Sequence, residues 1–386
     1  MKQESPELRE LRLDVRRFLA EKIAEGRFEP SIDTWLTKWD EGFTKELAEQ
    51  GWVGMTIPKE YGGHGRTFIE RFVVTEELLA VGAPVAAQWV ADRQIAPSLL
   101  AHGTEEQKKE YLPRIAAGES CFAIGMSEPD SGSDLASVRT RAVQVDGGWE
   151  VTGTKVWTSG AQYSEAFFCL ARTEPVDTSN RHAGLSQFLL DLRSEGVTIR
   201  PIESMSGSRH FSEVILDEVF VPDEMVFGEI GAGWKQVNSE LAFERSGPER
   251  FLSSFRLFAE AVSPSSGNEA VLDEATAGRW AARLAALHGL SRSVAETLQS
   301  GGKADVPASL VKVLGTTTEG DIVDGVEAAV GAAAAQGPAP GARVRVAARY
   351  PETEGPCHIR TPHYLRGREG VVERPLGAFP NPADLA

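Results

Sequence analysis

Cysteine is scarce in this sequence: Cys121, Cys169 and Cys357 are the three among 386 residues. They lie far apart, so their spacing matches neither a disulfide framework nor a set of metal ligands. We therefore expect incidental thiols in a reducing cytoplasm, and we assign no metal site. The dinucleotide fingerprint Gly-x-Gly-x-x-Gly is also missing as a strand-to-helix turn, so a dinucleotide cofactor would have to bind in a way unlike the Rossmann mode.

Long apolar runs and an excess of positive charge are absent as well. No run of about 18 apolar residues occurs, and the charged N-terminus is unlike a secretory signal. The formal net charge of -16 argues against nucleic acid and anionic membranes as partners. We expect a cytoplasmic protein whose 386 residues form two or three domains.

The hydrophobic spacing changes twice along the chain. Apolar residues recur at helical spacing up to about residue 120, short β-like segments follow from 121 to 228, and helical spacing returns from 229 to 327. Residues 328–340 are nearly all Ala, Gly and Pro, which indicates a linker or a frayed helix end, and 341–347 alternate like a strand. We predict an α+β protein with a helical domain 1–120, a β domain 121–228, a helical domain 229–327, and a linker and tail 328–386.

Two segments of the predicted β domain carry residues suited to a phosphorylated, flat ligand. Residues 122–134 read Phe-Ala-Ile-Gly-Met-Ser-Glu-Pro-Asp-Ser-Gly-Ser-Asp, a short apolar strand that opens into a loop. Backbone N–H groups and hydroxyls in such a loop can surround a phosphate. Residues 152–160 read Thr-Gly-Thr-Lys-Val-Trp-Thr-Ser-Gly and place an aromatic plane beside two hydroxyls. The pair suits a polar-edged ring held near a pyrophosphate.

Together these segments closely resemble the flavin-binding signature of the acyl-CoA dehydrogenase family. Residues 51–65 also resemble that family's Gly-Trp-x-Gly…Pro-x-x-Tyr-Gly-Gly-x-Gly string. The resemblance implies an N-terminal helical domain, a middle antiparallel β domain, a C-terminal helical bundle and FAD as cofactor. It assigns contacts with the flavin or the thioester to Met126, Ser127, Gly132, Ser133, Trp157 and Ser159. Taken singly, the serines favour surface turns and Trp157 favours a core or hairpin aromatic.

A carboxylate lies on an otherwise apolar helix face further along the chain. At helical spacing, Glu244 shares one face with Trp234, Val237, Leu241, Pro248 and Phe251. Lost hydration there raises the pKa of a carboxylate and favours a role as a base, unless a cation compensates. A structural glutamate paired with an arginine is the equally weighted alternative. Pro248 lacks the N–H that would bond to the Glu244 carbonyl, which predicts a kink or an opened turn.

The family resemblance favours the base. Isovaleryl-type and long-chain-type enzymes carry the catalytic glutamate next to an arginine in this helix, as in Glu244-Arg245 here. Glu244 would then remove the α-proton of an acyl-CoA while a β-hydride passes to flavin N5, which gives a trans-2-enoyl thioester. Hydrogen bonds to the thioester carbonyl would stabilise the developing enolate, and Arg245 would help to orient the substrate. The family's other glutamate position, Glu-Gly-Thr, has no counterpart.

Two departures from the family pattern bear on assembly. The Arg-x-x-Phe-Gly string by which family homotetramers hold a neighbouring subunit's flavin is missing between residues 263 and 278. Residues 355–374 instead resemble the small SH3-like barrel that ends nitrile hydratase β-subunits, which indicates an accessory or partner-contact segment.

The leading hypothesis is an FAD-dependent dehydrogenase of fatty acid or steroid side-chain metabolism. It would act on an acyl-CoA or an acyl-carrier-protein thioester and pass electrons to an electron-transfer flavoprotein, within a homo- or heterotetramer. The alternatives are a half-site or non-catalytic subunit of a heteromeric enzyme, and an oxygen-using flavoenzyme of the same fold. Fold analogy alone does not separate them.

Overall fold

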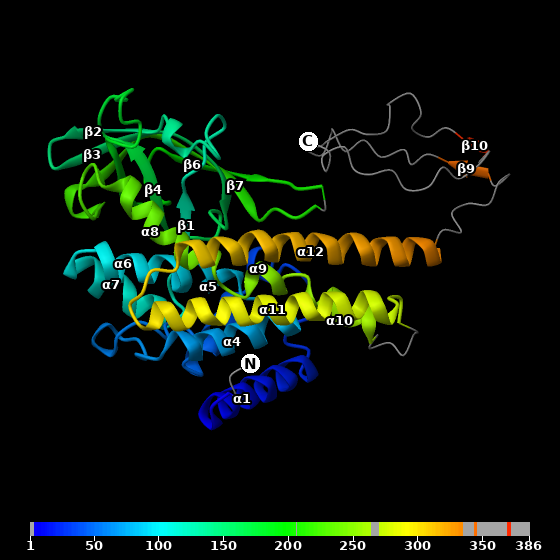
Figure 1. Ribbon diagram of the computed structural model, residues 1–386. Coiled ribbons are helices and arrows are strands. Elements are labelled where there is room, and N and C mark those ends of the chain that lie inside the picture. Colours follow the sequence, from blue (N-terminus) through cyan, green and yellow to red (C-terminus); the bar gives the residue numbers. More distant parts are fainter. Residues whose placement is uncertain (1–3, 206, 264–269, 335–342, 346–368, 372–386) are drawn as a thin grey trace.

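In the computed structural model, residues 4–205, 207–263, 270–334, 343–345 and 369–371 are described. Figure 1 shows a β domain, in green, stacked on a layer of helices. The N-terminal helices, in blue and cyan, and the C-terminal helices, in yellow and orange, lie together in that layer. The predicted fold class, helices on either side of a central β segment, is confirmed.

Capping residues set the starts of the N-terminal helices. Ser5 accepts a hydrogen bond from Leu8 N at the start of the first helix, and Thr67 and Thr104 each form a capping box with the residue three positions on. The helices are α1 (Pro6–Ala24), α2 (Thr34–Thr37), α3 (Glu41–Glu49), α4 (Phe68–Val81), α5 (Ala86–Val90), α6 (Ala96–His102) and α7 (Glu105–Ala116), with the π-helix η2 (Ala91–Ile95) between α5 and α6.

The β domain contains an eight-stranded sheet within the described residues. Its path runs β6-β7-β3-β2-β4-β5-β8, and β1 pairs in parallel with β4. Most other neighbours are antiparallel, as the resemblance implied. The strands are β1 (Phe122–Gly125), β2 (Arg141–Val145), β3 (Gly148–Ser159), β4 (Ala166–Arg172), β5 (Leu185–Asp191), β6 (Val197–Ile202), β7 (Phe211–Pro222) and β8 (Val226–Phe227).

The C-terminal helices include the predicted break at Pro248. Helix α8 (Gly233–Arg245) ends before this proline, and α9 (Glu249–Leu252) begins after it, so the expected interruption is confirmed. The helices α10 (Phe255–Val262), α11 (Glu274–Gln299) and α12 (Asp305–Ala334) follow. Helices α11 and α12 run alongside each other in Figure 1.

Buried side chains join the N-terminal and C-terminal helices into one core. Val15 and Phe43 from the first helices belong to the same cluster as Phe251, Trp280 and Ile322 from the last ones. A second cluster packs α6 and α7 against the sheet, through Leu99, Leu112 and Phe168 among others. Burial of these apolar side chains is the main favourable contribution to folding, and it fixes the sheet relative to the helices.

The tail begins as the end of a helix. Residues 328–340 were expected to be a linker or a frayed helix end, and α12 continues to Ala334, which agrees with the second alternative for the described part of this segment. Beyond it, β9 (Arg343–Arg345) pairs in antiparallel fashion with β10 (Glu369–Val371), and β9 lies within the predicted strand. Most of the segment that resembles nitrile hydratase, with Cys357, lies outside the described residues; Cys121 and Cys169 are buried and free.

Candidate functional site

A buried ion pair connects the two segments of the predicted flavin signature, residues 122–134 and 152–160. The Lys155 side chain on β3 is fully buried, and its ammonium lies 2.8 Å from Glu128 Oε1 and 3.2 Å from the Met126 carbonyl oxygen. Next to it, Val156 N donates to the Ser127 carbonyl over 2.9 Å. The loop after β1 and the end of β3 therefore form one surface, although about 30 residues separate them in sequence.

The Glu128 carboxylate is held in its charged form. Burial raises the pKa of Glu128, but the Lys155 charge and hydrogen bonds from Lys155, Thr140 N and Arg139 N outweigh it, so the pKa lies below the ordinary value. The two backbone donors lie 2.9 Å and 2.6 Å from its oxygens. A charged, fully bonded carboxylate of this kind anchors a loop but does not act as a base at neutral pH.

Trp157 occupies an unusual backbone conformation at the end of β3. Its φ is 61°, and the β3–β7 register shifts between Lys155 and Thr158, which marks a bulge. Positive φ is an outlier for a bulky residue, and bulges re-aim side chains at functional sites. The indole is 58% exposed and meets Phe211 edge-on at 5.9 Å, so one aromatic face is open. A core or hairpin aromatic would be covered.

Gly160, which ends this segment, is required by its surroundings. Its φ is 67°, and a Cβ at this position would lie 2.4 Å from the Trp39 ring. Its N–H donates to the His210 carbonyl over 2.8 Å. The turn after Ser159 is thereby fixed on both sides.

The loop after β1 has the polar groups that a flavin diphosphate requires. Gly132 and Ser133 are exposed, and a Cβ on Gly132 would meet no atom within 4 Å. Among the described residues, the hydroxyls of Ser127, Ser133 and Ser159 have no hydrogen-bond partner, and the buried Thr158 Oγ1 has none either. Free hydroxyls, an open backbone and an exposed indole on one surface fit FAD.

Helix α8 packs against this surface. Met126 belongs, with Trp234 and Val237 of α8, to a small cluster around the buried Leu170 and Leu185 of the sheet. Glu244 lies in the last turn of α8, but its side chain is outside the described part of the structure. Arg245 is half-buried, with Nη1 3.5 Å from Ser309 Oγ. The structure thus joins the loop that contains Met126 and Ser127 to the strand that contains Trp157 and Ser159, and it packs α8, which contains Glu244 and Arg245, against them.

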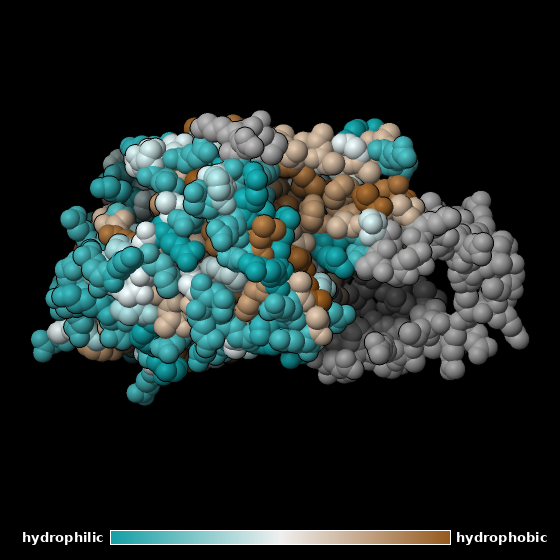
Figure 2. Space-filling view, turned by 90° about the horizontal axis from the view of Figure 1, so that it is seen from below, coloured by the Kyte–Doolittle hydropathy of each residue, from teal (hydrophilic) through white to brown (hydrophobic). Residues whose placement is uncertain are grey.

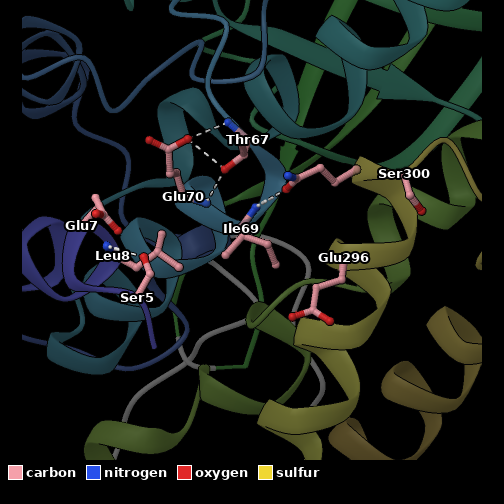
Figure 3. A pocket seen from close by; sticks show the side chains of 9 residues that line it. Ser5, Glu7, Leu8, Thr67, Ile69, Glu70, Glu296 and Ser300 are labelled. Carbon is pink, nitrogen blue, oxygen red and sulfur yellow. Dashed lines mark hydrogen bonds between the residues drawn. The ribbon is translucent and has the colours of Figure 1, made fainter. Parts of the chain in front are cut away.

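Two of the hollows in the described part of the structure differ in charge. One of about 580 Å³ lies between α1, α4 and α11, and Glu7, Glu70 and Glu296 are among the residues that line it (Figure 3). These acids disfavour the phosphates of FAD or CoA. The other hollow, of about 620 Å³, is lined by Lys235, Arg245, Lys303 and Asp305. Its balance of charge is positive, and Arg245 places it at the end of α8.

Comparison with known proteins agrees with this geometry. The family model described as "Acyl-CoA dehydrogenase, N-terminal domain" matches residues 5–119, and the one for the middle domain matches residues 123–219. FadE29, an acyl-CoA dehydrogenase of Mycobacterium tuberculosis, is 32% identical over 325 residues, which cover 81% of both proteins. The chain belongs to the acyl-CoA dehydrogenase family.

Other relatives in the acyl-CoA dehydrogenase family extend the comparison. FadE34 of Mycobacterium tuberculosis is 43% identical over 203 residues, or 52% of this chain, and the chain spans only 27% of FadE34. A solved structure called the Tcur3481-Tcur3483 steroid ACAD superimposes with a TM-score of 0.76 at 31% identity, covering 87% of this chain and 88% of that one. Among the described helices of this family member, none has the length and apolar character to cross a membrane.

Sequence reasoning missed the pair that organises the acyl-CoA dehydrogenase signature here. Glu128 and Lys155 lie inside the segments 122–134 and 152–160, but neither residue was predicted to have a role. The sequence did contain a signal for this pair. On β3, Lys155 lies four positions after the buried Val151, so the two-residue alternation of a strand places both side chains on the inward face. A lysine on an inward face needs an anionic partner.

Proposed function

We propose that this chain is an FAD-dependent acyl-CoA dehydrogenase with Glu244 as its base. The observation that supports this most is the exposure of the Trp157 indole. Trp157 lies at a β-bulge, next to the loop that Lys155 holds by its hydrogen bond to the Met126 carbonyl. In the family, FAD when bound supplies the acceptor for the β-hydride. An exposed, strained tryptophan has no evident structural benefit, and backbone strain of this kind is typical of functional sites.

The residues of the signature would divide the work of holding the cofactor. Ser127, Gly132 and Ser133 offer hydroxyls and open backbone to the diphosphate or the thioester arm. Trp157 would cover the ring, and Ser159 would lie near N5. The buried Glu128–Lys155 pair would hold both segments in register, because it orients the loop without touching the ligand.

The base and the substrate would meet at the end of α8. Helix α8 ends one residue after Glu244, just before the break at Pro248. Glu244 would remove the α-proton of the thioester, and the positive hollow lined by Lys235, Arg245 and Lys303 offers charge for CoA phosphates. The steroid enzyme among the similar structures supports a steroid side chain as one substrate class, with an electron-transfer flavoprotein as electron acceptor.

The first experiment expresses the chain alone, records its visible spectrum, and adds acyl-CoAs anaerobically. A yellow protein bleached by one class of thioester is the expected result. Glu244→Gln should keep flavin and ligand binding but lower turnover by about 10²- to 10⁴-fold. Glu274→Gln, an exposed glutamate at the start of α11, is the control and should leave turnover unchanged. Near-normal activity of Glu244→Gln would contradict the assignment of the base.

A half-site subunit of a heteromeric enzyme is the second candidate. Two observations favour it: the missing Arg-x-x-Phe-Gly string and a row of exposed apolar side chains on α12, where Val306 is 72% and Val313 60% exposed. Such a face is typical of a surface that another chain covers. Most of the face in Figure 2 is hydrophilic, with a hydrophobic band on one side. A folded but colourless protein that gains flavin only with a partner subunit would establish this candidate.

A further inference from the structure

A small hollow lined by two buried arginines lies directly behind the end of α8. Its volume is about 20 Å³, enough for one water molecule or one terminal group of a ligand. Arg71 on α4 and Arg93 on η2 line one side of it, and the link between α8 and α9, residues 246–248, lines another. On α11, Ser291 donates to the Ser246 carbonyl over 2.5 Å and so fixes that link.

Among the residues whose side chains the structure describes, Arg71 has no carboxylate partner of the kind that a buried guanidinium requires. Its side chain is 7% exposed, and its one hydrogen bond, to Thr56 Oγ1, is 3.5 Å long. The guanidinium also lies over the Phe68 ring at 4.9 Å. No carboxylate of the described residues lies within 4.0 Å of it. Burial and the charge of Arg93 lower the pKa of Arg71 to about 10, which indicates that Asp92 and Glu249 compensate it incompletely.

The neighbouring ion pair leaves further polar atoms unsatisfied. Arg93 Nη2 lies 3.4 Å from Glu249 Oε2, and Arg93 Nη1 lies 3.0 Å from Thr75 Oγ1. Arg93 Nε and Glu249 Oε2 have no hydrogen bond in the described part of the chain. Asp92 accepts from Gly54 N over 2.8 Å and so has one oxygen engaged elsewhere. Arg93 therefore has acceptors in Thr75 and Glu249, whereas the long contact with Thr56 is the one hydrogen bond of Arg71 among the described residues, so the donors of Arg71 are the least satisfied at this hollow.

The position of the hollow relates it to the reaction. Phe243, one residue before the proposed base, stacks on Phe68 at 6.2 Å, and Phe68 also lines the hollow. A group bound there would therefore lie on the inner side of the α8 terminus. The hollow is too small for a nucleotide or a ring, so the far end of an acyl group is the part that fits.

We propose that Arg71 binds an acceptor oxygen, a ketone or a carboxylate, at the far end of the acyl group, and so selects oxygenated over plain alkyl thioesters. This inference rests on the proposed acyl-CoA function. Arg71 acts on specificity in this scheme, since it binds an oxygen of the substrate and takes no part in moving the α-proton or the hydride. A planar guanidinium with five donors suits either oxygen, and a carboxylate can accept two of its N–H groups at once.

The test measures binding first, so that it does not depend on turnover. Three CoA thioesters of equal chain length, ending in a methyl, a ketone or a carboxylate group, are titrated against the protein by calorimetry. The unchanged chain should bind the ketone or the carboxylate about 10- to 100-fold more tightly than the alkyl thioester, the range expected for one hydrogen bond to a charged group. Arg71→Met should abolish this ratio and leave alkyl binding nearly unchanged. Arg71→Lys, which keeps the positive charge but not the planar group with five N–H donors, should keep part of this binding preference.

Each outcome decides one point. A ratio near one in the unchanged chain, or the same ratio in Arg71→Met, would overturn the role of Arg71 and leave the dehydrogenase proposal intact. Preference for the ketone would identify a neutral acceptor, and preference for the carboxylate an anionic one. If Arg71→Met does not fold, the partial loss in Arg71→Lys and the selectivity of the unchanged chain still decide. Selective binding with no flavin reduction by any thioester would overturn the dehydrogenase proposal alone.

Discussion

Removing the ammonium of Lys155 should destabilise the β domain strongly. In Lys155→Met, the buried Glu128 carboxylate keeps its two backbone donors, Arg139 N and Thr140 N, but among the described residues it loses the one cation within ion-pair distance. Breaking a buried ion pair from one side costs about 3–5 kcal/mol. Loss of the bond to the Met126 carbonyl should also loosen the loop that offers Ser127 to the cofactor.

The cost of Lys155→Met in unfolding free energy should depend on pH, and the pKa of Glu128 sets the direction of that dependence. Because the pKa of Glu128 in the folded chain lies below 4.5, its contribution to stability is present above that pH and is lost as pH falls through the folded pKa. In Lys155→Met the carboxylate becomes easier to protonate, so acid relieves part of the damage. The difference in unfolding free energy between the two proteins should therefore be smaller near pH 4 than at pH 7.

Urea unfolding, followed by tryptophan fluorescence at the two pH values, measures both effects. Lys108→Met is the matched control, because Lys108 forms a surface pair with Glu105 over 3.0 Å and should cost less than about 1 kcal/mol. The double variant Glu128→Gln/Lys155→Met removes both charges and should recover part of the loss. A cost for Lys155→Met as small as that of Lys108→Met would refute the reasoning.

Three further changes test other parts of the structure. Trp157→Ala should weaken flavin retention with little loss of stability, since the indole is 58% exposed; gel filtration followed by a visible spectrum measures this, and unchanged retention would reject the ring contact. Burial, with Asp33 nearby, raises the pKa of Glu319 from 4.5 to about 7, so the free energy of unfolding should fall as the pH rises from 4.5 to about 7. At about 1.4 kcal/mol per pKa unit this decline is worth about 3 kcal/mol, and Glu319→Gln should remove it. An unchanged pH slope in urea titrations of Glu319→Gln would contradict this reasoning. Truncation after Ala334 should leave flavin binding intact, and colourless protein would show that the tail belongs to the site.

Local patterns in the sequence were sufficient for the order of elements and for the signature residues. Alternation predicted short strands from residue 121 to 228, and β1 to β8 lie within these bounds, because a strand with one covered face repeats every two residues. Pro248 predicted the break after α8, since a missing N–H acts on its own helix. The joined motifs also identified the family, because they combine turn residues, hydroxyls and an aromatic ring at fixed spacing.

Only the tertiary structure brought distant charges together. No local rule pairs Lys155 with Glu128, 27 positions earlier, because this contact depends on how the loop after β1 meets β3. Nor does a local rule place Arg71 beside Arg93 and Glu249, because that depends on how α4, η2 and α9 pack. The exposure of Trp157 likewise depends on a bulge, which a register shift against β7 creates. The sequence by itself determined which elements form and which residues could carry the chemistry. The packing of those elements decided which charges are buried together, since burial and long-range electrostatics act between segments that sequence spacing does not relate.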